Sequence, residues 1–112
     1  MIIMDMQTLG VLCIKGRGFY AYGINRYNID LKFKSIHAEV EAIDKLKISE
    51  KAEKINMLVF RVNNKGDKLM MAKPCENCCN YIKGNLYKKN YKLKGGKCWF
   101  TDERGELDYV KI

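Results

Sequence analysis

The chain has 112 residues, of which 47% are hydrophobic, so we expect one globular domain over residues 1–112 and not a disordered segment. Its net charge of +8 favours polyanionic partners such as nucleotides or nucleic acid, although scattered lysines can also simply solvate a surface. Its start lacks the pattern of a signal peptide and no apolar run reaches the roughly 18 residues of a membrane span, so we expect a cytoplasmic protein without a membrane partner.

The first half of the chain predicts a hairpin and a helix. Apolar runs at 10–15 and 19–24, separated by a glycine turn at 16–18, are typical of two paired strands. A polar loop is expected over 25–34, followed by Ser35 as the N-cap of a helix. This helix would end near Lys47 and bury apolar residues spaced three or four apart: Ile36, Val40, Ile43 and Leu46.

The second half predicts a central strand, a second helix and a closing hairpin. The near-continuous apolar run at 55–62 is typical of a buried strand. Because proline is tolerated at a helix start, the second helix should begin near Cys75. Its inner face would carry Cys75, Cys79, Ile82 and Leu86. Strands at 98–101 and 107–112 would form an antiparallel C-terminal hairpin. The predicted order is β-β-α-β-α-β-β, an α/β fold with a mixed sheet of about five strands, two helices and a ligand at the strand ends.

Two short motifs supply the groups of a catalytic metal site. His37-Ala38-Glu39 precedes Pro74-Cys75-Glu76-Asn77-Cys78 by about forty residues. One imidazole and two thiols would leave the fourth position of a tetrahedral Zn²⁺ open, as in catalytic zinc sites. The ion would lower the pKa of a bound water to roughly 7, and Glu39 would move the protons of that water without ligating the metal. Because both motifs begin helices, we also expect the cysteine pKa values to be lowered.

Simpler interpretations exist for each residue. A lone Cys-x-x-Cys can be a redox pair or half of a structural zinc site, and a lone histidine is most often a satisfied, half-buried side chain. Glu39 can merely favour a helix N-terminus, and Cys79 is an alternative third thiolate. Cys13 and Cys98 lie in predicted strands and are expected to be small buried hydrophobic residues. Five cysteines, an odd number, argue against a disulfide framework and for reduced thiols.

The two motifs and the order of elements around them resemble the cytidine deaminase superfamily over nearly the whole chain. The resemblance implies a cytidine deaminase-like fold of two or three layers, with the zinc ligands His37, Cys75 and Cys78 and the proton shuttle Glu39. It also implies three substrate contacts. The backbone amide of Ala38 would contact the base, Asn25 the sugar, and Arg26 a phosphate, although Asn25 can instead shape a turn and Arg26 can simply be solvated.

The choice among substrates stays open at this stage. Free-nucleoside members usually show Cys-Ala-Glu and an acidic residue two places after the asparagine, whereas this chain has His37 and, after Asn25, Arg26-Tyr27. This favours a nucleotide or single-stranded nucleic acid, but the direct terminal hairpin resembles the free-nucleoside enzymes. We expect hydrolytic deamination of cytosine to uracil; adenine is the less favoured base. The alternatives are a free cytidine deaminase, a catalytically silent zinc-stabilised nucleotide- or nucleic-acid-binding domain, and a thiol redox protein.

Two surface features also bear on partners. Lysines among aromatic residues over 83–99 would suit a groove for a nucleic acid strand, or would simply build ordinary strands. The family's long first helix is missing or reduced to residues 1–9, which would leave one face of the sheet uncovered. An uncovered apolar face predicts a homo-oligomer.

Overall fold

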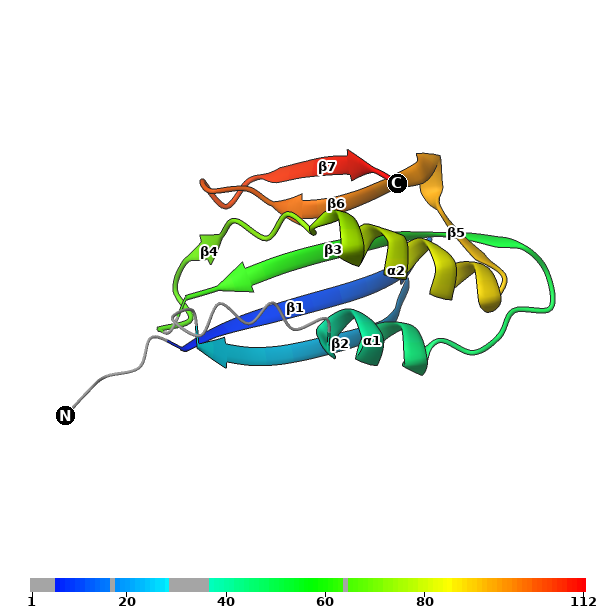
Figure 1. Ribbon diagram of the computed structural model, residues 1–112, viewed down its shortest axis with the longest axis horizontal. Coiled ribbons are helices and arrows are strands. Elements are labelled where there is room, and N and C mark those ends of the chain that lie inside the picture. The colour runs from blue at the N-terminus through cyan, green and yellow to red at the C-terminus, as the bar shows by residue number, and fades with distance from the viewer. Residues whose placement is uncertain (1–5, 17, 29–36, 64) are drawn as a thin grey trace.

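The computed structural model describes residues 6–16, 18–28, 37–63 and 65–112, and for residues 6–7, 18–20, 25–28 and 37 it describes the backbone alone. In this part of the chain seven strands form one sheet, and two helices lie side by side on one of its faces (Figure 1). The strand order along the main path is β2-β1-β3-β6-β7. The predicted mixed α/β architecture is therefore confirmed.

The N-terminal hairpin is longer than the sequence predicts. Strand β1 (Met6–Lys15) pairs antiparallel with β2 (Gly18–Asn28), from Met6 opposite Asn28 to Lys15 opposite Gly18. The expected loop over 25–34 is wrong for residues 25–28, which stay in β2 because β1 supplies pairing partners as far back as Met6. For the same reason residues 6–9 form strand and not helix. Residues 1–5 and 29–36, which include the expected cap Ser35 and the expected core residue Ile36, lie outside the described part.

Strand β3 (Glu53–Val62) is the centre of the sheet, as its apolar run predicts. It pairs antiparallel with β1 and parallel with β6 (Lys97–Thr101), which forms the predicted hairpin with β7 (Leu107–Lys111). Two short strands that the sequence pattern did not predict, β4 (Leu69–Met70) and β5 (Tyr91–Leu93), add to β3. A single 3₁₀ turn, η2 (Lys94–Gly96), joins β5 to β6.

The two helices are α1 (His37–Lys45) and α2 (Glu76–Lys88). Helix α1 ends two residues before the expected Lys47, where the ammonium group of Lys89 donates hydrogen bonds to three carbonyl oxygens, those of Ile43 (2.8 Å), Asp44 (3.0 Å) and Leu46 (2.6 Å). A cation is favourable at this end of a helix because the last carbonyls carry partial negative charge. Helix α2 begins just after Pro74-Cys75, as predicted.

Strand alternation divides the sheet into a covered and an open face. One row of cross-strand partners runs through Gly23, Val11, Val59 and Phe100, all buried beneath the helices. These pack with Ile43 of α1, with Leu46 just after its end, and with Ile82 and Leu86 of α2. Four of the predicted core positions are therefore confirmed. No described helix lies on the opposite face, so the described part of the fold has two layers (Figure 1). The oligomeric state stays a prediction.

Candidate metal and catalytic site

Cys75 and Cys78 lie together at the start of α2. Cys75 is the N-cap: its backbone is extended, and its sulfur accepts a hydrogen bond from the amide of Cys78 at 3.4 Å. The two sulfurs are 3.1 Å apart. Cys78 is buried, with 7% of its surface exposed, and Cys75 is half-buried. The helix start thus presents both sulfurs at one place, which is what a metal ion or a disulfide would need.

Glu39 lies on the first turn of α1 and is almost completely buried, with 3% of its surface exposed. Its Oε2 atom has no hydrogen-bond partner among the described residues. Burial raises the pKa of this carboxyl, and a hydrogen bond with its own backbone opposes the rise. A buried carboxyl oxygen without a partner is unfavourable by itself, and a catalytic role or a bound ion is one explanation for it.

The carboxyl group of Glu39 acts electrostatically on Cys78 of the cysteine pair. The pKa of Cys78 is raised to about 12, chiefly by burial and then by the hydrogen bond with Cys75 and the negative charge of Glu39. The expectation of a lowered thiol pKa is therefore wrong for Cys78. The helix N-terminus does favour a thiolate, but burial and two neighbouring acidic groups outweigh it.

For most of the other predicted site residues, the structure describes the backbone and not the side chain. His37 is the first residue of α1, two positions before Glu39, and its side chain lies outside the described part. Asn25 and Arg26 lie in β2, opposite Leu9 and Thr8 of β1, and their side chains are likewise not described. Ala38 is fully buried where α1 meets the sheet. The structure therefore places Cys75 and Cys78 in contact and places Glu39 near enough for its charge to raise the pKa of Cys78. The contacts of the other four residues stay untested.

The structure adds neighbours that the sequence did not single out. The charge of Glu39 contributes, after burial, to raising the pKa values of Tyr81 on α2 and Cys98 on β6. Tyr81 follows Cys78 by one helical turn, a spacing that places both on one side of α2. Gly23 lies under the first turn of α1, where a Cβ atom would stand 1.9 Å from the carbonyl oxygen of Ala38. A glycine inside a predicted strand is the signal for such a close approach.

Cys79 and the strand cysteines take other places. The sulfur of Cys79 is 3.9 Å from the carbonyl oxygen of Pro74, a weak hydrogen bond directed back along the chain. Cys13 and Cys98 are fully buried, as predicted, and burial raises the pKa of each thiol to about 12. The described residues include no disulfide.

One imidazole nitrogen and two sulfurs are atoms that zinc prefers as ligands. The described side chains alone do not form a group of three such ligands. The two sulfurs are described, and the imidazole of His37 is not. Two sulfurs on a tetrahedral zinc, each at about 2.3 Å, would be about 3.8 Å apart, so the 3.1 Å pair would open by about 0.7 Å. A divalent cation would also reverse the local electrostatics, because it stabilises thiolates that burial and Glu39 otherwise disfavour.

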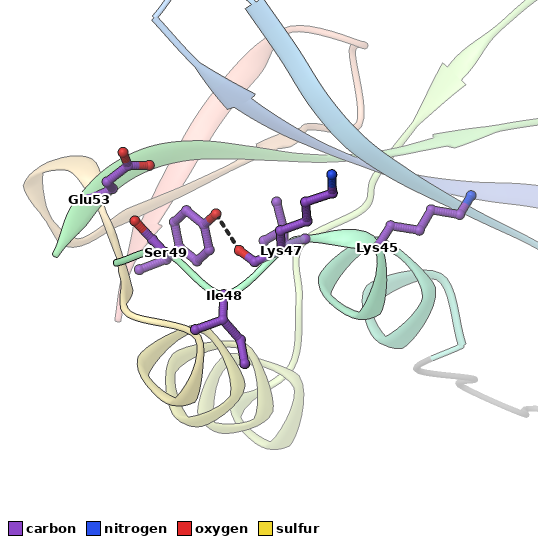
Figure 2. A pocket seen from close by; sticks show the side chains of 7 residues that line it. Lys45, Lys47, Ile48, Ser49 and Glu53 are labelled. Atoms are coloured by element: carbon purple, nitrogen blue, oxygen red, sulfur yellow. Dashed lines mark hydrogen bonds between the residues drawn. The ribbon is translucent and has the colours of Figure 1, made fainter. Parts of the chain in front are cut away.

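A cavity of about 440 Å³ lies away from this cluster, at the C-terminal end of α1 (Figure 2). It is lined by residues of the α1–β3 connection and of β5, including Lys45, Ser49, Glu53 and Tyr91. Lys45 follows Glu39 by six residues, or about 9 Å along a helix. The cavity is therefore separate from the cysteine–carboxylate cluster.

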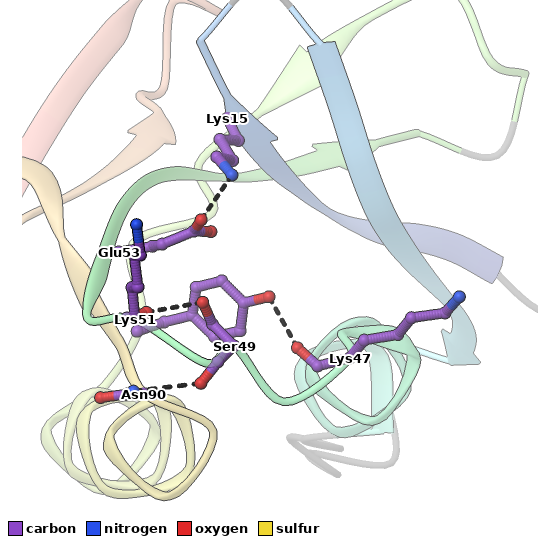
Figure 3. Close-up of polar contacts among 7 residues, drawn as sticks. Lys15, Lys47, Ser49, Lys51, Glu53 and Asn90 are labelled. Atoms are coloured by element: carbon purple, nitrogen blue, oxygen red, sulfur yellow. Dashed lines mark hydrogen bonds and ion pairs between the residues drawn. The ribbon is translucent and has the colours of Figure 1, made fainter.

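The polar groups around this cavity bind one another. The hydroxyl of Tyr91 donates to the carbonyl of Lys47 at 2.6 Å, and Lys15 pairs with Glu53 at 2.7 Å (Figure 3). Ser49 accepts a hydrogen bond from Asn90 through its backbone carbonyl at 3.0 Å. These contacts hold the α1–β3 connection against β5, a structural role that accounts for the residues without a ligand.

Within the described residues, neither helix has the length and apolar character needed to cross a membrane.

Comparisons with known proteins leave the family open. No family model matches the chain, and neither a curated protein nor a solved structure is significantly similar to it. The assignment of function therefore depends on the motifs and on the geometry described above.

Proposed function

We propose that the chain is a zinc-dependent hydrolytic deaminase of the cytidine deaminase type, which converts a cytosine base to uracil. The observation that carries the proposal is the buried carboxyl of Glu39, whose Oε2 lacks a partner among the described residues, beside the sulfurs of Cys75 and Cys78. The sequence supplies three ligands, one imidazole and two thiolates, together with one carboxylate. The proposal is supported by the effect of the Glu39 charge on Cys78, which lies on a different helix.

The metal would be held by His37, Cys75 and Cys78, and when bound it would supply a water whose pKa lies near 7 in place of 15.7. The protein's own contribution is proton transfer by Glu39. Because burial raises the pKa of this carboxyl, its two protonation states lie closer in free energy near neutral pH, which suits a group that both takes and returns a proton.

The overall reaction balances with water as the only co-reactant. The oxygen of water forms a bond to C4 of cytosine, and Glu39 takes one proton from that water and delivers it to the ring nitrogen. Glu39 then takes the proton of the new C4 hydroxyl and delivers it to the departing amine, as the C4 carbonyl forms. The bond between C4 and the exocyclic nitrogen breaks, and ammonia leaves. Within this scheme the backbone amide of Ala38 would contact the base, with Asn25 at the sugar and Arg26 at a phosphate.

The substrate form is tested by ammonia release. Zinc-loaded protein would be incubated with dCMP, deoxycytidine, cytidine, AMP, and DNA and RNA oligomers that contain cytosine. We expect release from dCMP or from a cytosine-containing oligomer, and little from the free nucleosides or from AMP. Activity confined to free nucleosides would favour the alternative assignment. Release from none of them by zinc-loaded protein would contradict the enzymatic proposal.

A further inference from the structure

The open face of the sheet carries an aromatic and apolar row. Cross-strand partners place Tyr22, Leu12, Leu58, Trp99 and Tyr109 side by side, one from each of the strands β2, β1, β3, β6 and β7. Five strands at a spacing of about 4.8 Å give this row a length of roughly 19 Å. No described helix covers this face, and the tyrosines at its two ends, Tyr22 and Tyr109, are 43% and 41% exposed.

Lysines accompany the row at both ends. The ammonium group of Lys97 lies 4.4 Å from the ring centre of Tyr109 and 5.8 Å from that of Trp99, whose two rings meet edge to face at 5.2 Å. At the other end Lys45 lies 4.2 Å from the ring centre of Tyr22. These are cation–π distances.

The charged residues at the described strand positions of this face are all basic. By strand alternation, its described positions also include Lys54, Lys92 and Lys111, and they include no Asp or Glu. The acidic strand residues Glu53 and Asp108 fall on the other alternation, opposite Tyr91 and Phe100. Lys45 is paired with Glu41 at 3.0 Å, so the acid-free positive charge of this face comes from its strand lysines, beside the stacking rings.

We propose that the open sheet face binds single-stranded nucleic acid, at a site separated by the sheet from Glu39 and the cysteine pair. Unpaired bases offer flat rings to stack on Trp99 and Tyr109, and phosphates offer negative charge to the lysines. A duplex hides its base faces and fits the row less well. Pairing of this face with a second copy, the basis of the homo-oligomer expected from the sequence, is disfavoured because it would place strand lysines against lysines with no acidic strand partner on the described face.

The test uses twelve-nucleotide oligo(dT) and oligo(U), which carry no exocyclic amine and so cannot be deaminated. Binding to them is thus measured independently of the proposed activity, and either can fail without the other. Trp99 is the single tryptophan of the chain, so its fluorescence reports directly on this face. We expect quenching on titration at 50 mM salt. Tyr109→Leu should weaken binding at least about fivefold, and Lys97→Gln should lower the salt dependence by about 0.7 of a log unit per tenfold change in salt.

The matched controls lie on the outer side of α2. Tyr87 is 74% exposed and is followed by the exposed Lys88, so Tyr87→Leu and Lys88→Gln remove the same side-chain types from another surface. Thermal unfolding would verify that each variant is folded. The inference is overturned if the oligomers do not bind, or if the α2 variants weaken binding and Tyr109→Leu does not. It is also overturned if light scattering shows an oligomer that Tyr109→Leu dissociates.

Discussion

Gly23→Ala tests the packing that positions Glu39. A Cβ atom at position 23 would stand 1.9 Å from the carbonyl oxygen of Ala38 and 2.8 Å from the amide nitrogen of Ala42. Both are backbone atoms of α1, so no change of rotamer relieves the clash and the helix itself must move. Ordinary contact begins at 3.4 Å, which requires a shift of about 1.5 Å.

The shift should be visible in both stability and activity. Overpacking of a well-packed site costs about 1–3 kcal/mol, and for a domain of this size each kcal/mol lowers the melting temperature by about 4 °C. We therefore expect a melting temperature lower by about 4–12 °C. Because α1 also carries Glu39, a displacement of an ångström or more should reduce deamination about 100-fold.

Circular dichroism during heating measures the first effect, and Gly84→Ala is the matched control. Gly84 lies inside α2, where a Cβ atom meets nothing within 4 Å, so alanine there should raise stability by up to about 1 kcal/mol through helix propensity. If Gly23→Ala unfolds at the wild-type temperature or above it, α1 does not rest on β2 at this glycine. The placement of Glu39 over the sheet would then be wrong.

Two further predictions concern stability. Lys89→Met should lower the free energy of unfolding in urea by about 1.5–3 kcal/mol, because it removes charged hydrogen bonds to three carbonyls at the end of α1. The control Lys88→Met should change it little, and equal losses in the two variants would contradict the capping role of Lys89. Burial raises the pKa values of the Cys13 and Cys98 thiols from 9.0 to about 12, so the stability linked to them should be complete below pH 9 and be lost above it, by up to about 1.4 kcal/mol per pH unit for each thiol. Urea unfolding between pH 8 and 10.5 should show a steeper fall for wild type than for the Cys13→Ala/Cys98→Ala double variant, and parallel curves would contradict this explanation.

The sequence was most informative where one local signal decides the structure. The apolar run at 55–62 predicted the central strand because continuous apolar runs are typical of strands in the middle of a sheet. In the fold one alternation of β3 is mostly buried and the other is mostly half-buried. Pro74 predicted the start of α2 because its ring is compatible with the first turn and not with the interior. The C-terminal hairpin followed from two strand patterns joined by a short turn.

Local sequence patterns did not predict features that depend on residues distant in the sequence. Residues 25–28 look like loop, yet they stay extended because β1 begins early enough to pair with them. The segment 83–99 looks like one basic patch, but the fold distributes it: Lys89 caps α1, Tyr91 is buried, and Lys97 and Trp99 lie on the open face. The direction of the Cys78 pKa shift also depended on burial and on Glu39, which comes from another helix.

Glu39→Gln with metal analysis tests the central proposal most directly, because it keeps the size of the side chain and removes its ability to carry a proton. We expect wild-type and variant protein to contain the same amount of zinc, close to one ion per chain, while ammonia release from the preferred cytosine substrate falls by at least about 100-fold in the variant. Equal rates in the two proteins, or wild-type protein that binds no zinc, would contradict the proposed mechanism. Bound zinc with no ammonia release from either protein would instead indicate the silent zinc-stabilised domain.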